Sequence, residues 1–156
     1  MTPHDAEQIS WSLGETAALA TKAARGAGMP WGLADETGAA VGWLQSRGIP
    51  GLSALCRYLK WRENGRITRW PDLPAGKTCY CPIELGTAYL DGALSPTLTI
   101  ESIREPVLIL PFIAKRNNDQ PVQVYLGDMS IHLSRDCIFT PYSDTALLIS
   151  QANCII

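Results

Sequence analysis

Four residues around position 30 have side chains that together could hold a small charged molecule: Lys22, Arg25, Trp31 and Glu36. Lys22 and Arg25 are three residues apart, so on a helix both point the same way. The glycines that follow and Pro30 indicate a turn, after which Trp31 and Glu36 arrive on a second helix. Two cations, an aromatic wall and a carboxylate suit a small carboxylate or amine ligand. The competing and more common interpretation is a structural ion pair between Arg25 and Glu36, with Trp31 as a packing wedge.

A second chemistry would use Cys81 and His132. Cys81 directly precedes Pro82 at an expected helix start, where the helix dipole lowers the pKa of a thiol, and His132 would then act as the base of a cysteine enzyme. Alternatively, Cys79 and Cys81 offer two thiolates to zinc, but a closed site needs two more ligands and no second pair has the usual spacing. We therefore expect no metal. We also expect no cofactor, because phosphate-loop and dinucleotide motifs are absent.

A third chemistry is nucleic-acid binding. The turn at residues 48–51 between two expected helices resembles a helix-turn-helix outline. Basic residues follow it, interleaved with Trp61 and Trp70: Arg57, Lys60, Arg62, Arg66 and Arg69. The net charge of −2 and the few base-reading side chains argue against this function. A solvated helix edge that runs into a basic loop is the favoured interpretation, so we expect no nucleic-acid partner.

The front half of the chain is expected to be helical. Ser12 and Glu15 have the spacing of a capping box, which begins a helix that runs to Ala27. A second helix starts around Pro30 and Trp31, and its Gly38 and Gly42 predict close approach of another backbone. Shorter helices are expected over 52–61 and 82–90, with a long surface loop over 62–81. The residues expected on the buried faces are Leu19, Ala20, Ala23, Ala24 and Ala27 in the first helix, Ala34, Thr37, Val41 and Leu44 in the second, and Leu52, Leu55, Cys56 and Leu59 in the third.

The back half is expected to form a sheet. Its strongest pattern is a hairpin over 122–133 with Gly127 and Asp128 as the turn, because that register places six apolar side chains on one face. His132 and Gln123 lie opposite each other on the other face. Further strands are expected over 97–103, 107–114 and 146–150, with Pro111 pushing the second of these toward an edge or a bulge.

These elements predict an α+β fold, with a helical subdomain at 1–94 packed on a mainly antiparallel β subdomain at 95–156 in one integrated unit. The N-terminus has acidic residues and no apolar run, so we expect no targeting peptide. The longest apolar run, 106–114, is less than half of the roughly 20 residues that cross a bilayer. Five cysteines, an odd number, favour reduced thiols and a cytoplasmic protein. Ile155 and Ile156 need cover from the core or from a second subunit, and we expect a homodimer.

The pattern Ala-Ala-Arg-Gly-Ala-Gly at 23–28, followed by Trp-Gly-Leu-Ala, an acidic pair, Trp43, Leu44 and Gly48, resembles the opening region of a bacterial family. That family is catalogued as the domain of unknown function numbered 3726, and the resemblance covers residues 12–52. It implies a bacterial cytoplasmic protein and no particular reaction or ligand. We therefore expect a non-catalytic protein of bacterial metabolism that binds a small ligand or a protein partner. The alternatives are an enzyme that acts on a small metabolite and a nucleic-acid binder.

Overall fold

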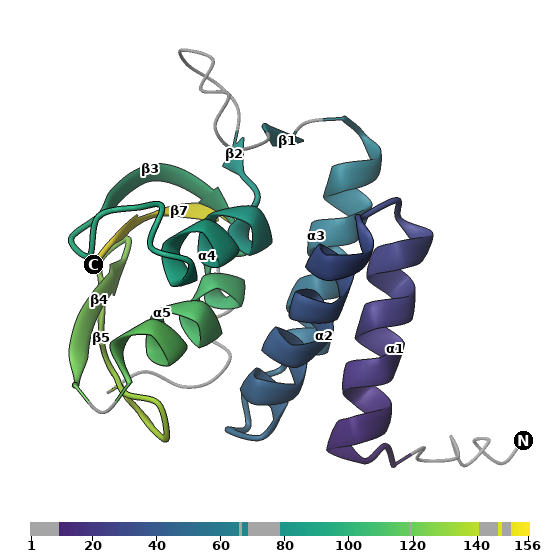
Figure 1. Ribbon diagram of the computed structural model, residues 1–156, viewed down its shortest axis with the longest axis horizontal. Coiled ribbons are helices and arrows are strands. Elements are labelled where there is room, and N and C mark those ends of the chain that lie inside the picture. Colours follow the sequence, from purple (N-terminus) through teal and green to yellow (C-terminus); the bar gives the residue numbers. More distant parts are fainter. Residues whose placement is uncertain (1–9, 66, 69–78, 119, 141–146, 148–150) are drawn as a thin grey trace, which may run out of the picture.

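The computed structural model describes residues 10–65, 67–68, 79–118, 120–140, 147 and 151–156 (Figure 1). Arg66, Arg69 and the expected strand at 146–150, except Leu147, lie outside the described residues. Leu147 is fully buried. No helix in the described part of the chain is long and apolar enough to cross a membrane.

Three helices of the N-terminal part form one layer: α1 (Leu13–Gly26), α2 (Trp31–Gln45) and α3 (Gly51–Glu63). Helix α1 begins at the predicted capping box, since the backbone N–H of Glu15 donates to Ser12 Oγ at 3.2 Å and that of Ser12 donates to Glu15 Oε2 at 2.8 Å. Two amides that a helix start leaves unpaired are thereby satisfied. Figure 1 shows α1 and α2 side by side, and α3 packs on both of them.

Gly38 and Gly42 set the close contact between α1 and α2. A Cβ atom at Gly38 would lie 2.7 Å from the carbonyl oxygen of Ala17, and one at Gly42 would lie 3.3 Å from the Cβ of Ala17. Only a hydrogen in place of a side chain fits such a distance from a backbone oxygen. The predicted close approach of another backbone is confirmed at Gly38, whereas the neighbour of Gly42 is the side chain of Ala17.

The predicted buried face is confirmed for α2 and is wrong in part for α1 and α3. Leu19 and Ala23 are exposed, because α2 packs along a different side of α1. That side is a stripe at four-residue spacing, formed by Thr16, Ala20 and Ala24. In α3, Cys56 is exposed, the predicted Leu55 is fully buried, and so is Tyr58, which was not predicted to be.

A second helical layer contains α4 (Pro82–Leu90), the 3-10 helix η1 (Pro106–Ile109) and α5 (Leu110–Asn117). Helix α4 has its predicted bounds, but the predicted strand at 107–114 is wrong. Glu105 adopts a left-handed conformation with φ of 46°, which ends the preceding strand, and Pro111 lies in the first turn of α5 where its missing N–H costs little. Every residue from 106 to 114 is buried. The run therefore lacks the alternation of apolar and polar residues by which a half-buried strand is recognised in a sequence. Helical structure therefore continues beyond residue 94.

The described strands form one mixed sheet in the order β1-β2-β3-β7-β4-β5-β6. Their bounds are Ile67–Thr68 (β1), Cys79–Tyr80 (β2), Thr99–Arg104 (β3), Val122–Leu126 (β4), Met129–Leu133 (β5), Ile138–Phe139 (β6) and Gln151–Ile155 (β7). Strands β1, β2 and β3 are parallel, and the remaining pairs are antiparallel. The predicted α+β class is confirmed, and so is the hairpin register, with Val122 opposite Leu133 and Leu126 opposite Met129.

Sequence analysis missed the short strands β1 and β2, which lie inside the expected loop at 62–81, and the short strand β6. The longest strand that it missed is β7. It lies between β3 and β4, so the C-terminal segment occupies the middle of the sheet (Figure 1). Its sequence is mixed, and Cys154 is its one buried residue. Ile155 remains 37% exposed, whereas Ile156 packs against the core.

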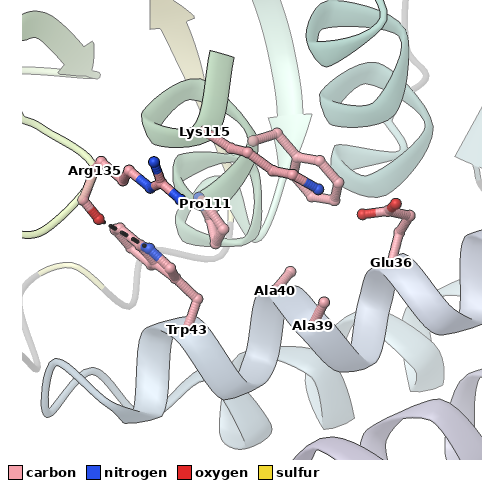
Figure 2. Close-up of a pocket in the computed structure, with 8 residues that line it drawn as sticks. Glu36, Ala39, Ala40, Trp43, Pro111, Lys115 and Arg135 are labelled. Carbon is pink, nitrogen blue, oxygen red and sulfur yellow. Dashed lines mark hydrogen bonds between the residues drawn. The ribbon is translucent and has the colours of Figure 1, made fainter. Parts of the chain in front are cut away.

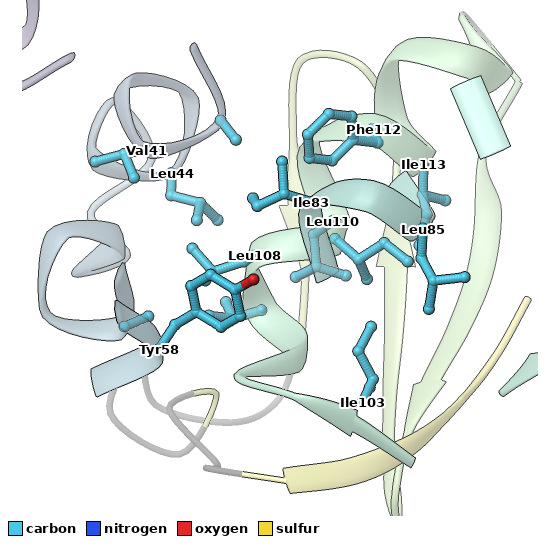
Figure 3. Close-up of a cluster of buried hydrophobic side chains, with 14 of the residues drawn as sticks. Val41, Leu44, Tyr58, Ile83, Leu85, Ile103, Leu108, Leu110, Phe112 and Ile113 are labelled. Carbon is cyan, nitrogen blue, oxygen red and sulfur yellow. The ribbon is translucent and has the colours of Figure 1, made fainter. Parts of the chain in front are cut away.

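The core joins both helical layers to one face of the sheet (Figure 3). Leu44 and Tyr58 from the first layer meet Leu108 and Ile83 from the second, and Ile103 belongs to the sheet. Residues from both parts of the chain therefore share one cluster of buried side chains. The opposite face of the sheet, which carries His132, is exposed.

Candidate functional site

Arg25 and Trp31 are the two predicted site residues that the structure brings together. The guanidinium carbon of Arg25 lies 3.0 Å from the centroid of the Trp31 ring, which is 67% exposed. Glu36 lies on another side of α2, because five residues turn a helix by about 140° beyond one full turn. Within the described residues no ion pair joins Arg25 to Glu36, and Lys22 is exposed on α1. The four residues do not form a single site, and the expected ion pair between Arg25 and Glu36 is wrong.

Glu36 instead lines a cavity between α2, α5 and the turn that follows β5 (Figure 2). The cavity has a volume of about 240 Å³. Its lining residues come from three places in the chain: Glu36, Ala39, Ala40 and Trp43 on α2; Pro111, Phe112 and Lys115 on α5; and Arg135 between β5 and β6. The α2 residues are three, four and seven positions apart, so they share one helix face. The two alanines leave the room that the cavity occupies.

Three charged side chains surround this apolar cavity. Figure 2 shows Glu36 and Lys115 directed toward one another from α2 and α5, whereas Arg135 lies at the other end, beside Trp43 and Pro111. None of the three charged groups has an ion-pair partner among the described residues. The cavity therefore combines an apolar lining with one carboxylate and two cations that are available to a ligand.

Arg47 fixes the wall of the cavity that contains Trp43 and Arg135. Its Nη2 donates to the carbonyl oxygen of Arg135 at 2.7 Å, and its Nη1 donates to that of Trp43 at 3.1 Å. Its guanidinium carbon also lies 3.8 Å from the centroid of the Trp43 ring. Trp43 Nε1 donates to the same carbonyl of Arg135 at 3.3 Å (Figure 2). The indole and the backbone that carries Arg135 are thus held in one arrangement.

The charge of Arg47 is partly balanced within the protein. Burial lowers the pKa of Arg47, and the negative charge of Asp136 opposes that effect. A guanidinium stays protonated throughout the physiological range despite such shifts. The turn itself is closed by hydrogen bonds from Ser134 N to Cys137 O at 2.9 Å and from Cys137 N to Ser134 Oγ at 3.3 Å.

Sequence reasoning missed most of this cavity. The signal that was present is the spacing of Glu36, Ala39, Ala40 and Trp43, which places a carboxylate, two small residues and an aromatic on one helix face. Trp43 and Arg47 are also four apart, a spacing that lets side chains meet on a helix. No local pattern connects these residues to Lys115 or Arg135.

Cys81 is buried at the N-terminus of α4. Its Sγ lies 2.7 Å from the hydroxyl of Tyr58, and the backbone N–H of Glu84 donates to it at 3.4 Å. The predicted lowering of its pKa is wrong: burial raises the pKa of the Cys81 thiol, and the hydrogen bonds from Tyr58 and Glu84 oppose this less strongly. His132 lies on the exposed face of β5. The structure does not bring the predicted nucleophile and base together.

Other predicted functional residues take part in contacts within the protein. Cys79 Sγ lies 3.0 Å from Ser102 Oγ. Arg57 forms a two-pronged ion pair with the buried Glu105, at 3.0 Å and 2.7 Å, and Arg62 donates to the hydroxyl of Tyr58 at 3.3 Å. Across the described ranges no cluster of three or more His, Cys, Asp or Glu residues suits a metal.

The fold is that of an α+β protein with a cavity of about 240 Å³ between two helical layers. Residues 11–80 match the model of the family described as a protein of unknown function, DUF3726. The resemblance that the N-terminal motifs indicate is confirmed, and it extends through α3 to β2. No curated protein and no solved structure matches the chain. The α2 wall of the cavity lies inside the matched segment, whereas Lys115 and Arg135 lie outside it.

Proposed function

We propose that this protein binds a small charged molecule in the cavity between α2 and α5 and that it performs no reaction on that molecule. One observation carries the proposal: an apolar cavity of about 240 Å³ is bordered by Glu36, Lys115 and Arg135, and none of them is in an ion pair with a described residue. Ligand pockets combine an apolar lining with a few polar groups that fix the ligand's orientation. The proposed site is therefore this cavity and not the N-terminal turn. Of the predicted residues Lys22, Arg25, Trp31 and Glu36, only Glu36 lines it.

The lining residues support binding better than catalysis. Among the described residues, the lining includes no serine, cysteine, histidine or tyrosine, and Glu36 is its one carboxylate. A nucleophile beside a base, or a pair of acids with different pKa values, would be the minimum for hydrolysis or group transfer. A carboxylate and two cations without such a partner are typical of recognition. An accessory role in metabolism follows, in which the bound molecule is carried or sensed.

We also propose that the protein works in the bacterial cytoplasm as a homodimer. All five cysteines are free, as is usual in a reducing compartment. Three large apolar side chains around the start and outer side of α1 are exposed and suit a second copy of the chain: Trp11, Leu13 and Leu19. Light scattering coupled to size exclusion should give twice the chain mass for the wild type and the monomer mass for Leu13→Asp/Leu19→Asp. A monomeric wild type would contradict the homodimer.

Native mass spectrometry with a defined panel of small carboxylates, amines and amino acids tests the binding function. The wild type should form one-to-one complexes with members of the panel. Ala39→Phe should abolish them, because Ala39 lines the cavity and its exposed position lets a phenyl ring fill the space without entering the core. Ala18→Phe is the matched control at an exposed helix position outside the cavity and turned away from Leu19, and its complexes should match those of the wild type. Complexes that survive Ala39→Phe, or no complexes at all, would refute the proposed function.

A further inference from the structure

We infer that the molecule bound in the cavity is an organic carboxylate with a small, flat apolar body, whose carboxylate pairs with Arg135 and whose body lies against Trp43. This inference rests on the proposed function, because it specifies the ligand class of the same cavity. It follows from the distribution of charge around the cavity, from the way Arg135 is held, and from the shape and length of the apolar lining.

The charges are distributed unequally between the two ends of the cavity. Glu36 and Lys115 face each other at one end, so each lies in the field of an opposite charge (Figure 2). Arg135 lies at the other end without an ion-pair partner among the described residues. Arg135, Arg47 and the neighbouring Asp136 together leave one net positive charge at this end. An anion there would therefore be attracted, whereas a cation would be repelled.

Arg135 is also held in a way that suits a carboxylate. Its carbonyl oxygen accepts one hydrogen bond from Arg47 and one from Trp43, so the backbone that carries the side chain is fixed. A guanidinium has a planar set of donors that matches a carboxylate with two parallel hydrogen bonds. Lys115 acts as a point charge and offers no such match. The more specific anion contact is thus expected at Arg135.

The length and the apolar character of the lining between the two ends favour a ligand with a short apolar body. Trp43 and Pro111 stand near Arg135, and the small side chains of Ala39 and Ala40 form the adjacent α2 surface (Figure 2). Glu36 and Trp43 are seven residues apart, which is about 10 Å along a helix. A single ring with a short arm fills this length and the volume of about 240 Å³. A ligand with an amine next to its carboxylate would place a positive charge beside Arg135, so α-amino acids should bind less well.

Four probes with nearly the same body test the inference by isothermal titration calorimetry: 3-phenylpropionate, phenylalanine, 2-phenylethylamine and 3-phenylpropanol. The wild type should bind 3-phenylpropionate at least tenfold more tightly than each of the others. Arg135→Gln should weaken that binding at least tenfold, and Arg135→Lys should restore part of it. Arg25→Gln is the matched control, because it makes the same change at an arginine that stacks on Trp31 outside the cavity, and it should change the affinity less than threefold. These variants at position 135 keep the carbonyl that Arg47 and Trp43 bind, so the wall should stay in place.

The possible failures of the two proposals are separable. Binding of the amine or the alcohol in preference to the carboxylate, with loss of that binding in Ala39→Phe, would overturn the carboxylate inference and leave the ligand cavity intact. Binding of 3-phenylpropionate that Arg135→Gln does not weaken would also overturn the inference. The absence of binding by all four probes would overturn the stated ligand class. The proposal that the cavity binds a ligand is then tested by the panel of small molecules in native mass spectrometry. Binding that Ala39→Phe leaves unchanged would locate the ligand elsewhere and contradict both proposals.

Discussion

The guanidinium of Arg47 and the backbone carbonyl of Arg135 are joined by a hydrogen bond of 2.7 Å across 88 residues of sequence. Trp43 Nε1 donates to the same oxygen, so one acceptor holds both the aromatic wall and the end of α2 against the turn after β5. A single main-chain atom therefore aligns two walls of the cavity. This arrangement makes Arg47 a positioning residue for the site, since it does not itself line the cavity.

We expect Arg47→Ala to lower both stability and ligand affinity. The change removes two hydrogen bonds to backbone carbonyls and the stacking on Trp43, which together stabilise the fold by about 1–2 kcal/mol. Urea denaturation followed by circular dichroism measures the loss. Arg25→Ala is the matched control, because Arg25 also stacks on a tryptophan, but on one that is 67% exposed. Equal losses in the two variants would show that the contacts of Arg47 with the backbone carry no stability.

Gly38→Ala and Gly32→Ala should change stability in opposite directions although both lie in α2. A Cβ atom at Gly38 would meet the backbone of Ala17, which cannot move without separating α1 from α2. Apart from its chain neighbours and the adjacent backbone of α2, no described atom lies within 4 Å of a Cβ placed at Gly32. Gly32→Ala should therefore stabilise the protein by up to about 1 kcal/mol through helix propensity, and Gly38→Ala should destabilise it by more than that. Thermal unfolding of both variants measures the difference, and a stabilising Gly38→Ala would contradict the close contact.

Arg57→Ala should destabilise the protein more than its partly exposed position suggests. Its partner Glu105 has a fully buried side chain, and the two groups lie 2.7 Å apart. Loss of Arg57 leaves a buried carboxylate without its cation, at a cost of about 2–3 kcal/mol, which is below the value for a fully buried pair because Arg57 is 39% exposed. The double variant Arg57→Ala/Glu105→Gln should recover part of this loss. A double-mutant cycle measured by guanidinium chloride denaturation gives the coupling energy between Arg57 and Glu105. If the losses of unfolding free energy in the two single variants simply add in the double variant, the predicted coupling is contradicted.

Stability should fall as the pH rises above 9, in part because of Cys154. Burial raises the pKa of this thiol from its ordinary value of 9.0 to about 12. Between these two values the unfolded chain has lost the thiol proton and the folded chain has kept it, so the free energy of unfolding falls with increasing pH. The slope from one such group reaches about 1.4 kcal/mol per pH unit. Unfolding of the wild type and of Cys154→Ala between pH 8.5 and 10.5 should show a shallower decline in the variant, and parallel curves would contradict the assignment.

Several elements could be predicted from local patterns alone. Ser12 and Glu15 specify the start of α1 because both partners of the capping box lie within one turn. The hairpin register follows from Gly127 and from the period of two in the strands, since a slip by one residue would expose all the apolar side chains. Each of these features depends on groups that are close in sequence.

The rest depends on contacts between distant segments. Residues 107–114 form helices because tertiary packing buries the whole run, so its apolar character does not distinguish a strand from a helix. The C-terminal strand β7 pairs with β3 on one side and with β4 on the other. These neighbours supply its backbone hydrogen bonds, and its own mixed sequence does not predict a strand. For the candidate site, the sequence by itself determined one helix face with Glu36 and Trp43. Only the tertiary structure decided that Lys115 and Arg135 lie opposite that face, because the position of a charged side chain on another element is set by the packing of all the layers between them.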